Sequence, residues 1–126
     1  MVKILVVEDD VLIQNLMVFK LKKESYEVIV ANDGVEGVRL AQTELPDLIL
    51  MDMRLPLLDG WEATEQLKTS SSTHTIPIIA LTAQSYSVVQ AKWDDVRCDG
   101  YAAKPIHFPT LMAQITRLTG KVNIAA

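Results

Sequence analysis

The sequence is poor in cysteine, in long apolar runs and in positive charge. Cys98 is the single cysteine among 126 residues, which excludes a disulfide within the chain and a zinc site built from several cysteines. No apolar run is long enough to span a bilayer, and no signal peptide is visible at the N-terminus. The 12 lysines and arginines are outnumbered by 16 acidic residues, which disfavours a nucleic-acid surface. We therefore expect a cytoplasmic domain with no membrane segment and no nucleic-acid partner.

Short apolar runs alternate with amphipathic stretches along the chain. Apolar runs between turn signals are typical of buried strands, and apolar residues at spacings of three and four are typical of helices. The predicted strands are 4–7, 26–30, 47–51, 76–81 and 100–103. A helix is expected after each strand, the third over 60–68 and the fourth over 84–96. This alternation predicts one α/β domain, a flavodoxin-like doubly wound (βα)5 fold with a parallel sheet in the order 2-1-3-4-5.

Polar side chains follow four of the predicted strands. Glu8 and Asp9 follow the first strand, Asp52 the third, Thr82 the fourth and Lys104 the fifth. Because parallel strands bring their carboxyl ends to one edge of the sheet, we expect these side chains to lie together around Asp52. Crowded carboxylates repel one another, so one of them takes a proton or a cation lies among them. A hard divalent cation such as Mg²⁺ suits oxygen ligands of this kind.

This set of side chains suits a phosphoryl group held on Asp52. A carboxylate can act as a nucleophile and form an acyl phosphate. Lys104 would offer a compact positive charge to a phosphoryl oxygen, and the Thr82 hydroxyl could donate to another. Each residue alone also has a structural explanation: an aspartate such as Asp10 favours a helix N-cap, Thr82 could cap the next helix, and Lys104 could be a solvated charge. Their arrival at one edge favours the chemical interpretation.

Five motifs, in order and at characteristic spacing, carry a family resemblance. They are Ile4–Asp10, Asp47–Pro56, Asp59-Gly60, Ile78–Ala83 and Tyr101–Pro105. With these motifs the chain resembles the receiver domain of two-component response regulators, of the stand-alone, chemotaxis-regulator-like kind. The resemblance covers about 3–118, so we expect a receiver domain over 1–120 and a C-terminal tail over 121–126.

The resemblance implies a site and a donor. Asp52 would accept a phosphoryl group from a phosphohistidine on a sensor histidine kinase or a histidine phosphotransfer protein. Mg²⁺ would be held by Asp52, by Asp9 directly, by Glu8 through water and by the backbone carbonyl of Arg54. The side chains of Arg54 and Gln84 match positions that tune the phosphoryl lifetime. The chain would catalyse its own phosphorylation and slow autodephosphorylation, and would not otherwise be an enzyme.

The resemblance also implies a switch. Thr82 and Lys104 would contact the phosphoryl group, and Thr82 with Tyr101 would form the switch pair, in which the hydroxyl moves and the ring turns inward. The Lys104-Pro105 bond matches one that is usually cis, which makes Pro105 the expected cis-proline. A downstream effector protein would read the state of the switch on the face formed by the fourth helix, fifth strand and fifth helix.

Several alternatives stay open from the sequence. The chain could be a phosphoryl-relay intermediate, or a docking module that is not phosphorylated. A Mg²⁺-dependent phosphohydrolase is disfavoured because Arg54 stands two places after Asp52, where a second acid is needed. A flavin-binding module is disfavoured because the acidic run 8–10 would repel the cofactor phosphate at the first loop.

Overall fold

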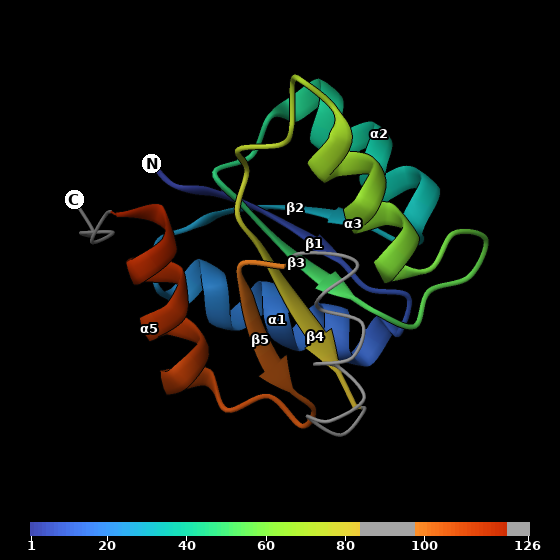
Figure 1. The fold of residues 1–126 in the computed structure, drawn as a ribbon. Coiled ribbons are helices and arrows are strands. Elements are labelled where there is room, and N and C mark those ends of the chain that lie inside the picture. The colour runs from blue at the N-terminus through green and yellow to red at the C-terminus, as the bar shows by residue number, and fades with distance from the viewer. Residues whose placement is uncertain (84–97, 121–126) are drawn as a thin grey trace.

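The strands of the protein form one parallel sheet with helices on both faces (Figure 1). The computed structural model describes residues 1–83 and 98–120. The strands are β1 (Lys3–Val7), β2 (Glu27–Ala31), β3 (Leu48–Asp52), β4 (Ile78–Thr82) and β5 (Gly100–Ala103). Their order is β2-β1-β3-β4-β5, and every neighbouring pair is parallel, which confirms the predicted topology.

Four helices lie in the described part of the chain. They are α1 (Val11–Lys23), α2 (Gly34–Glu44), α3 (Gly60–Thr69) and α5 (Phe108–Thr119). Helices α2 and α3 cover one face of the sheet, and α1 and α5 cover the other (Figure 1). The helix predicted over 84–96 lies outside the described residues, as does the tail at 121–126. Within the described ranges, no helix has both the length and the apolar character needed to cross a bilayer.

The strand boundaries differ from the predicted ones by at most two residues, and β4 differs most. This strand begins at Ile78 because Pro77 has no N–H to give to the ladder. The Pro77 carbonyl still accepts a hydrogen bond from the backbone of Ile49 at 2.9 Å. Strand β3 runs one residue further than predicted and ends on Asp52 itself, so this side chain is set by regular strand geometry.

The core has two layers, one on each side of the sheet. Successive strand side chains point to opposite faces. In β1, Leu5 and Val7 pack toward α2 and α3, whereas Ile4 and Val6 pack toward α1 and α5. Every residue of β3 and β4 is buried, as expected for strands covered on both faces. The site residues therefore follow strands that are buried on both faces.

The spacing of the apolar residues over 13–21 predicts the buried face of α1, and the structure confirms this face only in part. Met17 and Leu21 are fully buried, as the spacing suggests, but Leu16 is 49% exposed. Two further apolar side chains of this helix, Leu12 and Phe19, are 80% and 59% exposed. Because α1 carries apolar residues on nearly all sides, periodicity could not separate its inner face from its outer one. We call Leu12, Leu16 and Phe19 the outer apolar surface of α1.

Candidate functional site

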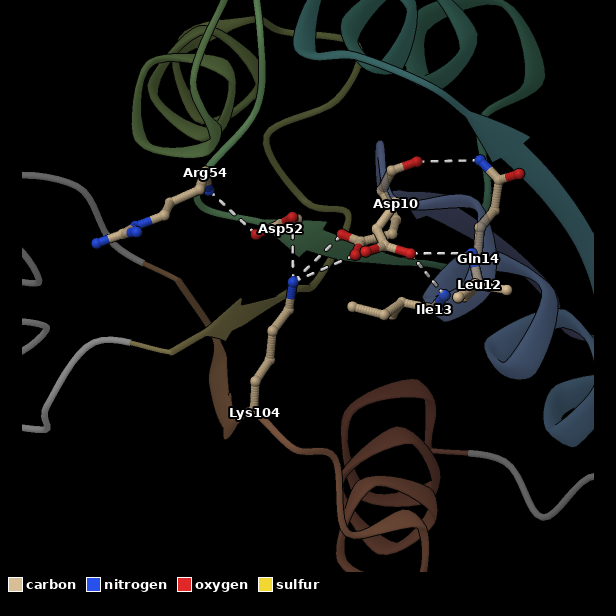
Figure 2. A network of polar contacts seen from close by, with 8 residues as sticks. Asp10, Leu12, Ile13, Gln14, Asp52, Arg54 and Lys104 are labelled. Carbon is tan, nitrogen blue, oxygen red and sulfur yellow. Dashed lines mark hydrogen bonds and ion pairs between the residues drawn. The ribbon is translucent and has the colours of Figure 1, made fainter.

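Lys104 is the centre of an ion-pair cluster at the carboxyl edge of the sheet. Its Nζ lies 3.1 Å from Asp52 Oδ2 and 3.2 Å from Glu8 Oε1. Figure 2 shows the side chain of Lys104 extending from the end of β5 toward Asp52. Strands β1, β3 and β5 therefore contribute one charged group each. The predicted meeting of these three residues is found, although Glu8 and Lys104 are 96 residues apart in sequence.

Glu8 shows how the crowding of carboxylates is relieved. Its side chain is fully buried, whereas that of the adjacent Asp9 is exposed. Burial, then a hydrogen bond with Asp52 and the negative charge of Asp52, together raise the pKa of Glu8 to about 8, against the opposing effect of Lys104. Below that pH, Glu8 holds a proton that it shares in a hydrogen bond with Asp52. A shared proton is one of the two solutions expected from the sequence, and the raised pKa of Glu8 favours it whenever no cation lies among the carboxylates.

This pKa predicts a pH-dependent stability. The folded protein keeps Glu8 protonated up to about pH 8, whereas the unfolded chain loses that proton near its ordinary value of 4.5. Between these values the folded state binds more protons, so the free energy of unfolding should fall as pH rises, by a few kcal/mol in total. Urea unfolding in EDTA from about pH 5 to about pH 8.5 should show this fall. The Glu8→Gln variant should lack it, and equal slopes in both proteins would refute the assignment.

Lys104 keeps its positive charge throughout this range. Partial burial works against the charge, but the negative charges and hydrogen bonds of Asp52 and Glu8 outweigh it and raise the pKa of Lys104 above its ordinary value. A permanent cation thus faces the two buried carboxyl groups. It can also face any anionic group that joins them at this edge.

Glu8, Asp9 and Asp52 form a possible metal-binding set. One carboxylate oxygen from each lies within 4.8 Å of the others. Oxygen donors of this number suit a hard divalent cation, and Mg²⁺ is typically held by one or two carboxylates plus waters. Asp9 is exposed, which leaves a solvent side where waters could complete the coordination. Glu8 must lose its proton to act as a ligand, so metal binding at this set would release protons.

The loop after β1 is held by Asp10 and Gln14. Asp10 Oδ1 accepts hydrogen bonds from the backbone N–H groups of Leu12 at 2.9 Å and Ile13 at 3.2 Å, and so caps α1 (Figure 2). The structural interpretation of Asp10 is therefore correct. Gln14 Nε2 donates to the backbone carbonyl of Glu8 at 3.0 Å. Sequence reasoning missed Gln14, because an amide on a helix gives no sign of the carbonyl it will reach.

The loop after β3 is built around the carboxylate of Asp52. Asp52 is 4% exposed, and its Oδ1 accepts a hydrogen bond from the backbone N–H of Arg54 at 3.0 Å. The side chain of Arg54 is exposed and points away from Asp52 (Figure 2). At Gly60 an added Cβ would lie 2.2 Å from the carbonyl oxygen of Asp52, so this close approach needs glycine. The first residue of α3 therefore lies directly against the backbone at the end of β3, where Asp52 is placed.

The remaining predicted residues lie on the last two strands. Thr82 ends β4 and is 2% exposed, and it is paired with Ala103 at the end of β5. Tyr101 lies opposite Ala80 in the same ladder and is half-buried. The Lys104-Pro105 peptide bond is cis. Gln84 lies outside the described residues.

Comparison with known proteins gives one consistent result. The family model described as "Response regulator receiver domain" matches residues 4–116. A curated relative, the alkaline phosphatase synthesis transcriptional regulatory protein PhoP of Bacillus subtilis, is 36% identical over 124 residues, which are 98% of this chain and 51% of that protein. The chain spans about half the length of several curated relatives that it matches.

Solved structures agree with the sequence comparison. The receiver domain of the sensor histidine kinase PA1611 from Pseudomonas aeruginosa, with a magnesium ion in its active-site cleft, is 34% identical with a TM-score of 0.87. That match covers 94% of this chain and 98% of the other. The receiver domain of Saccharomyces cerevisiae Ssk1, solved with the histidine phosphotransfer protein Ypd1, is 28% identical with a TM-score of 0.85 and covers 98% and 92% of the two chains.

Proposed function

The chain belongs to the response regulator receiver domain family, whose members are phosphoryl-accepting modules of two-component signalling, and we propose that Asp52 is the residue that accepts the phosphoryl group. The observation that carries this proposal is the 3.1 Å contact between Asp52 Oδ2 and Lys104 Nζ at the carboxyl edge of the sheet. It places a nucleophilic carboxylate and a permanent cation side by side where parallel sheets bind ligands.

The donor we propose is a phosphohistidine on a histidine kinase or a histidine phosphotransfer protein. An oxygen of Asp52 attacks the phosphorus, a P–O bond forms, and the P–N bond breaks with its electron pair left on the imidazole nitrogen. Lys104 then contacts a phosphoryl oxygen, and the hydroxyl of Thr82 donates to another. Mg²⁺, held by Glu8, Asp9, Asp52 and the Arg54 carbonyl, would neutralise charge on the transferring group.

We propose that the result is a switch that catalyses its own phosphorylation and its slow autodephosphorylation. A phosphoryl group adds roughly −1.5 to −2 charges and three acceptor oxygens. Thr82 and Lys104 would be drawn toward them, and Tyr101 would turn inward. The effector would read the face that includes β5 and α5. We propose a receiver domain over residues 1–120 that works in the cytoplasm. A role as a phosphoryl-relay intermediate would use the same chemistry at Asp52.

The proposal is tested by removal of the metal. Purified protein is incubated with acetyl phosphate and either Mg²⁺ or EDTA, and its intact mass is measured over time. We expect the gain of one phosphoryl group with Mg²⁺ and a rate lower by about tenfold or more in EDTA, because the charge on the transferring group is then not neutralised. No gain in either condition would favour a docking module that is not phosphorylated.

The outer apolar surface of α1 is the place where we expect the donor protein to dock. Leu12, Leu16 and Phe19 are all at least 49% exposed, and contiguous exposed apolar residues mark interaction sites. A small apolar cavity of about 180 Å³ continues this surface, and Leu16 and Lys104 both line it. The apolar surface therefore leads directly to the ion-pair cluster. A partner seated on it would bring a histidine close to the ion-pair cluster that contains Asp52.

This docking predicts a selective defect. Leu12→Glu adds a charge at a position that is 80% exposed, so the fold should be unaffected. The donor is the phosphohistidine protein that phosphorylates the wild type fastest among a panel of such proteins. Phosphoryl transfer from this donor to the variant should slow by about tenfold or more, because the introduced charge must be desolvated on docking. The rate with acetyl phosphate should be unchanged. Equal slowing with both donors would place Leu12 in the chemistry, and no slowing with either would remove α1 from the interface.

A further inference from the structure

A side chain from α5 covers the outer edge of β5 at Tyr101. Strand β5 pairs with β4 on one side, and the backbone of Tyr101 faces the other side. Gln114 Oε1 accepts a hydrogen bond from the Tyr101 N–H at 3.2 Å, and Gln114 Nε2 donates to the Tyr101 carbonyl at 2.9 Å. One amide thus satisfies both backbone groups of one residue, as a neighbouring parallel strand would.

The surroundings of Gln114 are shaped for this contact. Its neighbours in the buried stripe of α5, Leu111 and Ile115, are fully buried, so Gln114 is a polar side chain set beside an apolar stripe. At Gly100 an added Cβ would lie 2.5 Å from Gln114 Oε1. A larger residue at position 100 would therefore push the amide off the strand. Gly100 thus leaves the space that the Gln114 amide needs to reach the backbone of Tyr101.

The two hydrogen bonds between Gln114 and Tyr101, called here the Gln114 clamp, join β5 to α5. Both elements belong to the proposed switch. Tyr101 stands three residues before Lys104, whose ammonium contacts Asp52 at 3.1 Å. Any change in the partners of Lys104 acts on the end of β5, and the two hydrogen bonds of Gln114 tie that strand to α5. We infer that Gln114 is a positioning residue that couples β5 to α5, so that the phosphorylation state of Asp52 reaches the helix. This inference rests on the proposed function.

The first part of the test examines the clamp itself. Gln114→Leu keeps the side chain out to the δ position and removes both hydrogen bonds, whereas Gln114→Glu keeps an acceptor for the Tyr101 N–H and loses the donor. Hydrogen exchange of the Tyr101 amide should accelerate by about fivefold or more in the leucine variant and less in the glutamate variant. The Lys104 amide, which donates to the Thr82 carbonyl at 2.9 Å, serves as the internal reference. Unchanged exchange at Tyr101 in both variants would show that the clamp is absent.

The second part measures coupling by backbone NMR with acetyl phosphate and Mg²⁺. In the wild type, amide shifts should change around Asp52 and also along α5. In Gln114→Leu the changes around Asp52 should remain, and those along α5 should fall by at least about half. Gln42→Leu, at an exposed glutamine of α2, is the matched control and should behave as the wild type. A merely structural role for Gln114 would leave the α5 response intact.

The outcomes separate the two proposals. Changes around Asp52 with an α5 response that is equal in wild type and both variants would overturn the coupling role alone. A wild type whose amide shifts change around Asp52 but not along α5 would also overturn the coupling role alone. No change around Asp52 in the wild type would overturn the proposed function, and the coupling role with it. If Gln114→Leu does not fold, Gln114→Glu decides between these outcomes, since one of the two hydrogen bonds remains.

Discussion

Asp52→Asn is expected to gain no phosphoryl group from acetyl phosphate and Mg²⁺ under conditions in which the wild type gains one. Asparagine keeps an oxygen for the Arg54 N–H, which donates to Asp52 Oδ1 at 3.0 Å, so the loop after β3 should hold its shape. The amide oxygen is too weak a nucleophile to form an acyl phosphate. Intact mass and a urea unfolding curve should therefore show a folded protein without phosphoryl uptake.

The matched control for this variant is Asp10→Asn. Asp10 stands next to the acidic pair, but its side chain caps α1 through the N–H groups of Leu12 and Ile13. Asparagine is as good an N-cap as aspartate, so stability and phosphoryl uptake should both stay near those of the wild type. Uptake by Asp52→Asn at the wild-type rate would mean that another residue accepts the phosphoryl group. Loss of uptake in Asp10→Asn would show that the effect is not specific to Asp52.

Lys104→Met is expected to have the second largest effect, on stability and on rate. The substitution leaves Glu8 and Asp52, which are 0% and 4% exposed, without their cation. Removing one partner of a buried ion pair typically lowers the free energy of unfolding by about 3 kcal/mol or more. In EDTA the loss should be largest above pH 8, where Glu8 ionises, and smaller near pH 5, where Glu8 is protonated. The rate of phosphoryl uptake should fall by about 100-fold, as when a transition-state charge partner is removed.

Lys68→Met provides the matched control. Lys68 Nζ contacts Asp99 Oδ2 at 2.7 Å and the carbonyl of Ile76 at 2.8 Å, near the amino ends of β4 and β5. Its loss should lower stability by about 1 kcal/mol, since the pair is partly exposed. Phosphoryl uptake should not change, because the contact lies at the opposite end of the sheet. Equal rates in Lys104→Met and wild type would exclude Lys104 from the reaction.

Much of the site could be predicted because it depends on strand ends. Each apolar run showed where a strand stops, and parallel topology then required Glu8, Asp52 and Lys104 to meet. The same reasoning identified Asp10 as a cap, because N-caps depend on neighbours in sequence. It could not show which of Glu8 and Asp9 is buried. The structure buries Glu8 fully and exposes Asp9, and this difference gives Glu8 its raised pKa.

The features that sequence reasoning missed depend on contacts between distant elements. Gln14 and Gln114 are ordinary helix residues in a local view, and their partners are a loop carbonyl and an edge strand. A polar residue beside the apolar stripe of α5 was the available signal for Gln114. The inner face of α1 could be predicted only in part, because the outer side of this helix is nearly as apolar as its inner side. Such a helix shows two hydrophobic surfaces, of which the sheet covers one.

The most direct test of the central claim is the position of the phosphoryl group in the chain. Protein treated with acetyl phosphate and Mg²⁺ is reduced with borohydride, which converts an aspartyl phosphate to homoserine, and is then digested for peptide mass spectrometry. We predict homoserine at position 52 and at no other aspartate. Homoserine at position 9 in place of 52, or a phosphoryl group that resists borohydride, would contradict the assignment of Asp52 as the acceptor.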